Sequence, residues 1–146
     1  MQHGTETEPQ ARAQFTMRTG LLVEEVGFVP HPDIDLSGAS PDGLVGENGL
    51  VEIKCPNTAT HIQTLRGKPI DRKYILQMQW QMACTGRDHC WFVSFDPRMP
   101  GDLSFYLEKV AKDDALISEI SEAVRGFSAD LEEMISDLNS IKGEAA

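Results

Sequence analysis

The sequence predicts an α/β domain in which helices flank a central mixed β-sheet. Along the 146 residues the predicted elements run helix, three strands, helices, two strands and helix, an order that folds into layers around one sheet. The pair Asn48-Gly49 lies between two strand patterns and is a strong signal for a hairpin. From Asp113 onward, apolar residues recur at spacings of three and four, which indicates a long helix.

Length and composition fit one globular domain with a single core. Hydrophobic residues make up 40% of the chain and charged residues 25%, both of which are ordinary values. No apolar run reaches 18 residues, so a membrane-spanning helix is not expected. The three cysteines lack paired metal-ligand spacing and are expected to be free thiols in a reducing cytosol.

The charge of the chain is unevenly distributed. The formal net charge is −10, with 23 acidic against 13 basic residues, and binding to a phosphate backbone favours the opposite sign. However, carboxylates that hold divalent metal ions count as negative in this sum, and much of the acid lies in the C-terminal third. The segment 61–73 is basic instead, with one acid against Arg66, Lys68, Arg72 and Lys73. The distribution of charge therefore weighs more than its sum.

The N-terminal segment is expected to form a helix. Thr5-x-x-Glu8 ahead of an apolar periodic segment has the pattern of a capping box, and Gly20 suits the end of the helix. Pro9 falls near the first turn of such a helix, where proline is tolerated.

Three strands are expected next, at 21–29, weakly at 34–40, and at 50–55, where Pro56 ends the last of them. Two helices are expected after it, at 58–65 and from Asp71 onward. Two strands follow at 89–95 and 103–110, and a final helix begins at Asp113. The apolar stripe of the final helix is interpreted as its buried face in preference to a subunit interface.

Side-chain alternation brings a charged pair to one face of the third strand. In a strand, residues i and i+2 point the same way, about 7 Å apart at their backbones. Val51 and Ile53 are then expected to face the core, while Glu52 and Lys54 point outward together. Asp42 lies on the other arm of the Asn-Gly hairpin, so two carboxylates and an ammonium group are expected to meet.

Asp42, Glu52 and Lys54 fit the chemistry of metal-assisted phosphodiester hydrolysis. Mg²⁺ prefers hard oxygen ligands, binds few protein carboxylates and keeps its other positions for water and phosphate. A bound metal acidifies water and neutralises developing charge, while a lysine can orient the water or stabilise the transition state. The alternative is structural, since an Asp in a Pro-Asp-Gly turn is often only a turn former and Glu-x-Lys is often a solvated strand face. For these three residues in isolation the structural interpretation is favoured.

A larger pattern resembles a known family. "SPDG" followed by "EIKCP", with nine residues between Asp42 and Glu52, is similar to the signature of the PD-(D/E)XK nucleases. More closely, it resembles the phage lambda exonuclease and YqaJ-like viral recombinase family. "HGTETEPQAR", "YILQMQWQM" and "WFVSFDPRM" also resemble family segments, in the family's order. Four ordered blocks over nearly the whole chain are far more specific than a lone D-x9-E-x-K pattern, and the resemblance implies the PD-(D/E)XK core.

The resemblance implies a metal centre. Asp42 and Glu52 match metal ligands, the backbone carbonyl of Ile53 matches a further ligand, and Lys54 matches the catalytic lysine. Glu8 matches an acidic residue on the preceding helix that holds a metal directly or through water, with the capping-box glutamate as the alternative.

Other residues match positions around the substrate. Ser40 matches a position near the phosphate of the cleaved strand, and Gln77 matches a glutamine beside the metals that orients the water or a phosphate. Gln79 is expected to pack in the interior or support the site. His61 is expected at the surface, and the basic residues expected to reach the DNA backbone are Arg66, Lys68, Arg72 and Lys73.

The family resemblance also implies an activity and partners. It implies a Mg²⁺-dependent exonuclease with two ions, Mn²⁺ being an alternative, that degrades one strand of double-stranded DNA from its 5′ end. It further implies phage-type recombination with a single-strand annealing protein, a toroidal homotrimer threaded by DNA, and the cytoplasm of a bacterial host of the phage or prophage.

Two alternatives remain beside this exonuclease. One is another PD-(D/E)XK endonuclease or repair nuclease, and the other is a non-catalytic DNA-binding remnant of such an enzyme. Members of the family carry a substantial segment before the helix that matches Glu8, whereas this chain starts almost at that helix. The expectation is therefore a single nuclease domain over residues 1–146 that lacks this segment.

Overall fold

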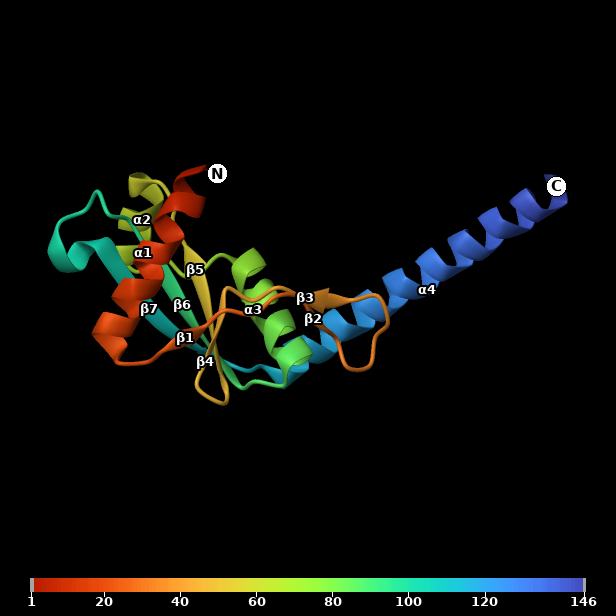
Figure 1. The fold of residues 1–146 in the computed structure, drawn as a ribbon, viewed down its shortest axis with the longest axis horizontal. Helices are drawn as coiled ribbons and strands as arrows, with labels where there is room; N and C mark the ends of the chain where they lie inside the picture. The colour runs from red at the N-terminus through yellow and green to blue at the C-terminus, as the bar shows by residue number, and fades with distance from the viewer. Residues whose placement is uncertain (1, 146) are drawn as a thin grey trace.

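A five-stranded mixed sheet lies at the centre of the computed structural model, which describes residues 2–145 and the side chains of residues 6–143 (Figure 1). Only β5 and β6 pair in parallel, and the other neighbours pair antiparallel. In spatial order the strands are β1 (Val23–Glu24), β4 (Gly43–Val45), β5 (Gly49–Lys54), β6 (His89–Phe95) and β7 (Phe105–Ala111). The predicted α/β class with a central mixed sheet is confirmed.

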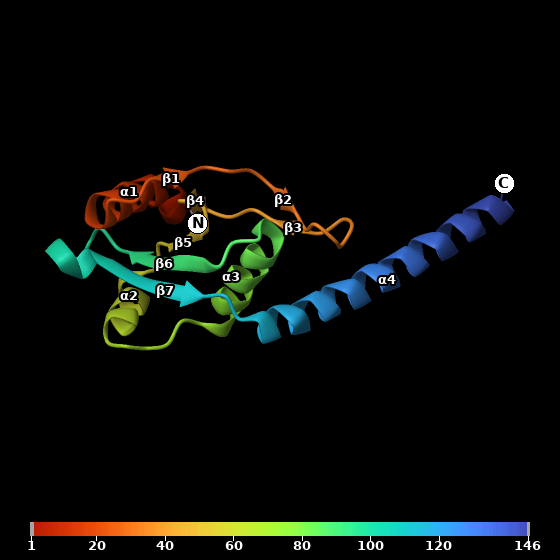
Figure 2. The ribbon, with the colours of Figure 1, turned by 90° about the horizontal axis from the view of Figure 1, so that it is seen from below.

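Helices cover both faces of the sheet. α1 (Gln2–Thr19) lies on one face, whereas α2 (Thr58–Leu65) and α3 (Arg72–Thr85) lie on the other (Figure 2). Both α2 and α3 fall between β5 and β6 in the sequence, because a parallel strand pair requires a crossover connection that packs back onto the sheet. β5 lies between α1 on one face and the helices on the other, and all its residues except Lys54 are buried.

Two apolar clusters separate along the two faces of the sheet. The cluster beneath α1 consists of Ala11, Phe15, Val45, Val51, Ile53, Val93, Phe95 and Phe105. The cluster beneath α3 consists of Leu50, Met78, Met82, Cys90 and Phe92. Alternate residues of β5 thus enter different clusters, as the period of two in a strand requires.

The hairpin predicted from the Asn-Gly pair is confirmed. Gly43 pairs with Val51 and Val45 pairs with Gly49, and the turn between them contains Gly46 with a φ of 61°. Because that φ lies in the left-handed region, glycine meets no steric penalty there.

The single strand predicted at 21–29 is wrong. The chain leaves the main sheet after Glu24, because β4 is only three residues long and offers β1 only two pairing partners. It then forms β2 (Val29–Pro30), which pairs antiparallel with β3 (Gly38–Ala39) as a separate two-stranded ribbon. The weak strand predicted at 34–40 corresponds to β3.

The predicted capping box is also wrong. α1 begins three residues before its first member, so the segment Thr5–Glu8 lies inside the helix, as does Pro9. Thr7, Ala11 and Phe15 recur every fourth residue and are all buried against the sheet. This packing stabilises a longer helix than the local capping signal predicts, since most helical stability in proteins comes from tertiary contacts.

The final helix, α4 (Asp114–Ala145), projects away from the body of the molecule (Figures 1 and 2). Only its first turns pack against α3, and from Phe127 onward its apolar residues are exposed. The buried-face interpretation of this stripe is therefore wrong for its distal part. Of the described helices, none is long and apolar enough to cross a membrane.

Candidate active site

The hairpin and β5 bring Asp42, Glu52 and Lys54 together. Lys54 Nζ lies 2.9 Å from Glu52 Oε1, so these two residues of one strand face form an ion pair. Asp42 immediately precedes β4, and its Oδ2 accepts a hydrogen bond of 2.8 Å from the backbone N–H of Ile53. The short-range geometry predicted from the sequence is confirmed for all three residues.

Glu52 does not point outward, contrary to the sequence prediction. Its side chain is only 6% exposed, because residues of α3 pack over the face of β5 from which it projects. A carboxylate at such a site needs partners for both oxygens, since burial of an unpaired charge is costly. Lys54 supplies one partner, and Gln81 Nε2 on α3 supplies the other, donating to Glu52 Oε2 at 2.7 Å.

Gln81 is a residue that sequence reasoning missed. It lies one helical turn after Gln77, and residues four apart share a helix face. That spacing is the signal in the sequence that could have placed Gln81 beside the site. Gln79, two residues earlier, serves the structure instead, because its amide bonds the backbone of Ala111 and Asp113.

Lys54 is enclosed by three groups. Besides Glu52, its ammonium lies 3.5 Å from Gln77 Oε1 and 4.3 Å from the centre of the Tyr74 ring. Burial opposes the charged form of the lysine, but the attraction and the hydrogen bond of Glu52 outweigh burial and raise the pKa of Lys54 above its ordinary value. Lys54 is therefore a fixed cation at neutral pH.

Asp42 sits in the opposite situation. Burial and the neighbouring Glu52 carboxylate raise the pKa of Asp42 from 3.8 to about 7, with Glu8 adding a smaller effect in the same direction. The hydrogen bond from Ile53 and the charge of Lys54 oppose this rise without cancelling it. The site thus holds more negative charge than its own cation neutralises.

Glu8 on α1 lies close enough to act on Asp42 electrostatically, but its carboxylate is engaged elsewhere. Arg12, one turn later on the same helix, forms an ion pair with it at 3.3 Å. Within residues 6–143 no three side chains of His, Cys, Asp or Glu converge as a metal-binding group. The side-chain carboxylates at the candidate metal position are therefore Asp42 and Glu52, with Glu8 at a greater distance.

The backbone at Ile53 faces the same position. β4 pairs with β5 only as far as the pair Gly43 and Val51, so the edge of β5 beyond Val51 is not covered by β4. The N–H and C=O groups of one strand residue point to the same side. Since the Ile53 N–H is directed at Asp42, its carbonyl oxygen is directed to that side as well.

The residues predicted to contact DNA are all exposed, but they divide between two sides of α3. Lys68 and Lys73 line one hollow with Tyr74, next to the ring that contacts Lys54. Arg72 lines a groove between α3 and α4 instead. Ser40 is exposed two residues before Asp42, and Arg66 is exposed at the end of α2.

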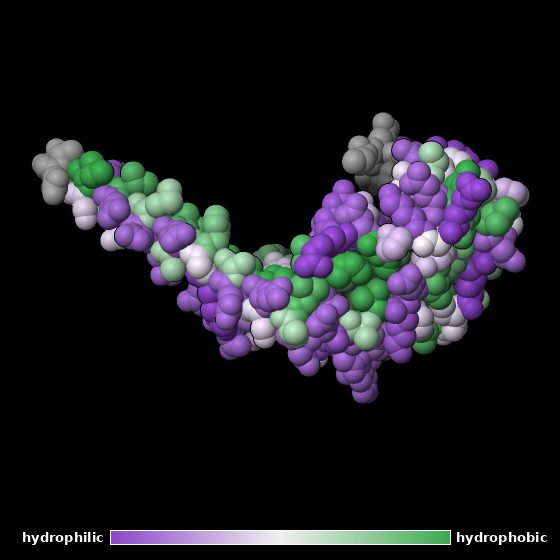
Figure 3. Space-filling model, turned by 180° about the vertical axis from the view of Figure 1, so that it is seen from behind, coloured by the Kyte–Doolittle hydropathy of each residue, from purple (hydrophilic) through white to green (hydrophobic). Residues whose placement is uncertain are grey.

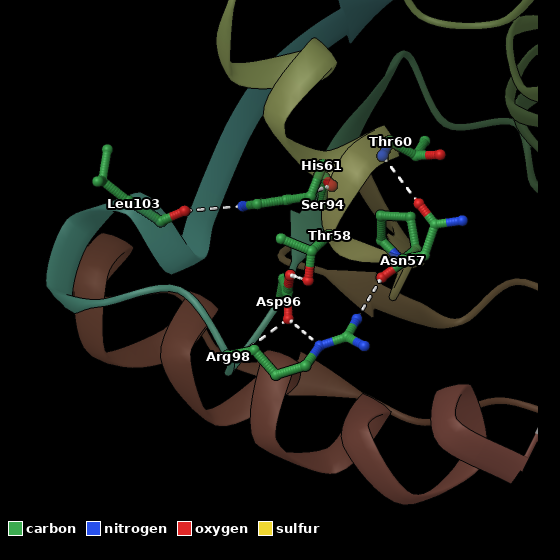
Figure 4. Close-up of polar contacts among 9 residues, drawn as sticks. Asn57, Thr58, Thr60, His61, Ser94, Asp96, Arg98 and Leu103 are labelled. Carbon is green, nitrogen blue, oxygen red and sulfur yellow. Dashed lines mark hydrogen bonds and ion pairs between the residues drawn. The ribbon is translucent and has the colours of Figure 1, made fainter.

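A network of polar contacts fastens α2 to the end of β6 (Figure 4). Asp96 is fully buried; its carboxylate accepts a bond of 2.6 Å from Thr58 and bonds from the backbone and side chain of Arg98. Burial alone would raise the pKa of Asp96, but the bonds from Thr58 and Arg98 lower it to about 2. Arg98 therefore stabilises the turn that follows β6.

The placement expected for His61 is wrong. His61 is fully buried, with Nδ1 2.8 Å from Ser94 Oγ and Nε2 2.8 Å from the carbonyl oxygen of Leu103 (Figure 4). It joins α2 to β6 and to the 3-10 turn Gly101–Ser104, because a helix face directed at the sheet buries whatever residue it carries.

Comparison with known proteins identifies relatives of the whole chain. The profile of the YqaJ-like viral recombinase domain matches residues 1–88. An alkaline exonuclease, LHK-Exo, from Laribacter hongkongensis is 54% identical, and its crystal structure superposes with a TM-score of 0.95 over 100% of this chain and 75% of that chain. The same exonuclease in complex with dAMP superposes with a TM-score of 0.94 over the same shares and is also 54% identical.

A more distant structure shares the fold. A phage-related exonuclease from Haemophilus somnus 129PT is 18% identical, with a TM-score of 0.77 over 94% of this chain and 72% of that chain. Among curated proteins, none matches the chain.

Proposed function

The chain belongs to the YqaJ-like viral recombinase family, and on that premise we propose that it is a metal-dependent exonuclease that degrades double-stranded DNA from its 5′ end. The observation that carries the proposal is the convergence of Asp42, Glu52 and Lys54 at the C-terminal end of β5. The residues support metal-assisted hydrolysis, and the family resemblance supports the duplex substrate, the 5′→3′ polarity and a role in phage-type recombination.

The donor set fits a hard divalent cation. Asp42, Glu52 and the carbonyl of Ile53 would hold it, and oxygen ligands in so small a number are what Mg²⁺ favours. The raised pKa of Asp42 fits the same assignment, because carboxylates that repel each other gain most from a cation between them. Bound Mg²⁺ or Mn²⁺ would acidify a water molecule and neutralise charge on the phosphate. We propose two ions, with Glu8 reaching the second through water.

Lys54 and Gln77 act on the substrate side of the site. Because its pKa is raised, Lys54 remains charged and stabilises the negative charge that develops on the attacked phosphate. Gln77 is exposed, and its amide lies beside the ammonium of Lys54, where it can orient the water or a phosphate oxygen. We assign Ser40, two residues before Asp42, to a phosphate of the cleaved strand, as the family resemblance implies.

The DNA strand is proposed to leave the site across Tyr74. The hollow beside this ring has a volume of about 310 Å³, and Lys68 and Lys73 line it, so two cations meet the backbone within one segment. Arg66 extends this basic surface at the end of α2, whereas Arg72 contributes from the α4 side. Each phosphate contact of this kind steepens the slope of log K against log[salt] by about one unit.

The relatives support the substrate class. LHK-Exo has been crystallised with dAMP, a deoxynucleoside monophosphate, which is the class of product that an exonuclease releases from DNA. We further propose a homotrimer that works with a single-strand annealing protein in the bacterial cytoplasm, as the family resemblance implies. The exposed stripe on α4 gives such an assembly an apolar contact surface.

Three labelled DNAs test the activity: a 5′-phosphorylated duplex, a 5′-hydroxyl duplex and a covalently closed circle, each incubated with Mg²⁺. We expect mononucleotides from duplex ends and an intact circle. Nicked or linearised circles would instead favour an endonuclease, and binding without hydrolysis a non-catalytic remnant.

Substitution of Lys54 tests the assignment of the site. Lys54→Met should lower turnover about 10²–10³-fold, because it removes charge stabilisation that is greatest in the transition state, while Mn²⁺ binding changes little. Lys109→Met is the matched control, because Lys109 lies over Trp91 on another strand. Wild-type turnover in Lys54→Met would contradict the assigned role.

A further inference from the structure

The two oxygens of Glu52 are held from two different elements. Oε1 is held by Lys54, on the same strand, and Oε2 is held by Gln81, on α3. A glutamate side chain has three rotatable bonds, so one flexible lysine alone leaves several orientations open. The second anchor comes from the buried face of α3 and fixes the plane of the carboxylate.

Gln81 itself is bound in an unusual way. It is only 7% exposed, and its Nε2 makes a short bond of 2.7 Å to Glu52. Its Oε1 is buried and, within the described part of the chain, has no hydrogen-bond partner. Since an ionised carboxylate only accepts hydrogen bonds, the amide must turn its nitrogen toward Glu52 and leave its oxygen unpaired.

A buried polar atom without a partner calls for an explanation. A methionine or leucine of similar volume would fill the same place on α3 without the unpaired oxygen. What such a residue could not do is donate to Glu52. The unpaired Gln81 Oε1 lowers the stability of the fold, whereas Gln81 Nε2 holds the Glu52 carboxylate. Such a loss of stability is expected for a residue that serves a functional site.

We propose that Gln81 is a positioning residue that orients the Glu52 carboxylate for cation binding. By holding Glu52 Oε2, it leaves Glu52 Oε1 directed toward Lys54 and the substrate side. This inference rests on the proposed metal-dependent hydrolysis. Residues that support metal ligands from behind typically change metal affinity or activity by about 10–100-fold when they are substituted. Gln81 acts only through Glu52, so its effect must appear in cation binding even when DNA is absent.

The test compares Gln81→Met with Gln79→Met in the full chain. Both substitutions remove a buried amide from α3, but the amide of Gln79 bonds only backbone groups of Ala111 and Asp113. We would measure Mn²⁺ affinity by calorimetry without DNA, Tm in EDTA, and kcat and KM with Mg²⁺ and duplex DNA. Gln81→Asn provides a second variant, because it keeps the amide but is too short by one methylene to reach Glu52.

We expect Gln81→Met and Gln81→Asn to bind Mn²⁺ about 10–100-fold more weakly and to lose kcat by a similar factor with little change in KM. Gln81→Met removes one partner of the Glu52 carboxylate but also an unpaired buried oxygen, so its Tm should fall less than that of Gln79→Met, which leaves two backbone groups without partners. Gln79→Met should keep its Mn²⁺ affinity. Wild-type Mn²⁺ affinity and kcat in the Gln81 variants, or equal losses in Gln79→Met, would overturn the role of Gln81 alone. A wild-type chain that neither binds Mn²⁺ nor hydrolyses DNA would overturn the proposed function and this inference together.

Discussion

At the scale of single residues, the site stores negative charge that its own lysine does not balance. Asp42 and Glu52 each have one oxygen tied to the protein framework, by the Ile53 N–H and by Gln81 respectively. Lys54 pairs with Glu52, and its charge lowers the pKa of Asp42 by less than burial and Glu52 raise it. On the proposed metal-dependent function, we expect this uncompensated charge to lower the stability of the metal-free chain and to favour binding of a cation.

This cost predicts a pH dependence in the absence of metal. The pKa of Asp42 rises from 3.8 in the unfolded chain to about 7 in the folded one, so between these values the folded state binds more protons. The free energy of unfolding should then fall as the pH rises from 4 to 7, by at most about 4 kcal/mol from this group. Asp42→Asn should remove this part of the fall and be more stable than wild type at pH 8 in EDTA.

Urea unfolding at pH 5 and pH 8, with EDTA present, measures this difference. Asp35→Asn is the matched control, because Asp35 is an exposed aspartate in a loop away from the site. If wild type and Asp42→Asn lose the same stability between the two pH values, the burial of charge at Asp42 is not what the structure indicates.

The residues of the site differ in how far the sequence could predict them. Asp42, Glu52 and Lys54 meet through one hairpin and one strand, so local geometry is sufficient to bring them together. The burial of Glu52 and the contact with Gln81 depend on a helix that returns over the sheet, and strand alternation carries no information about that return. The burial of His61 could not be predicted for the same reason, because the sequence does not show which face of α2 lies on the sheet.

At the scale of elements, the hairpin and the parallel pair β5–β6 position the site, and α3 supplies Tyr74, Gln77 and Gln81 to it. The hairpin was predictable because its turn has a strong local signal. The ribbon of β2 and β3 was not, because strands of two residues carry little periodicity and depend on a partner distant in sequence. α1 begins earlier than the local capping pattern predicts, because its packing on the sheet outweighs that pattern.

The network of polar contacts at the end of β6 should stabilise the folded chain. Asp96→Ala would remove the buried carboxylate that accepts hydrogen bonds from Thr58 and Arg98. Loss of these bonds should lower the free energy of unfolding by about 2–3 kcal/mol. The Tm at pH 7 should fall by about 5–10 °C. Because the pKa of Asp96 is lowered to about 2, its contribution is present above pH 4, and the difference from wild type should narrow as the pH falls from 4 to 2.

Differential scanning calorimetry measures this loss, and Asp102→Ala is the control. Asp102 also pairs with an arginine, Arg18, at 3.0 Å, but its side chain is 97% exposed, and such surface pairs contribute about 0–1 kcal/mol. Equal Tm values for Asp96→Ala and Asp102→Ala would mean that the network in Figure 4 does not secure α2.

At the scale of the whole molecule, α4 separates from the body in shape and in charge. Residues 114–145 contain eight acidic and two basic residues, a net charge of −6, which leaves −4 for the rest of the chain's −10. DNA phosphates would be repelled by this helix. Hydrophobic side chains gather along α4 and at its junction with the body (Figure 3), so the exposed surface of the helix suits a protein partner.

The apolar stripe of α4 is continuous. At 100° per residue its members fall within about a third of the helix circumference, and they are Phe127, Leu131, Met134, Ile135, Leu138 and Ile141. Its first half borders a hollow of about 330 Å³, which Phe28 and Leu36 of the ribbon region line from the other side. A helix that extends without packing partners is marginally stable in water, so a second copy lying on this stripe would stabilise it.

The last prediction concerns the mass of the particle in solution. We expect wild type to exceed the 16.2 kDa of one chain and, as a trimer, to reach three times that value, 48.6 kDa. Phe127→Glu combined with Leu138→Glu should yield the 16.2 kDa monomer, because it places two charges in the stripe without disturbing the core. Ala129→Glu combined with Ser136→Glu adds the same charge to the opposite side of α4 and should leave the mass unchanged. Light scattering coupled to size-exclusion chromatography distinguishes these outcomes, and a wild type that elutes as a monomer at micromolar concentration would show that the stripe does not join copies of this chain.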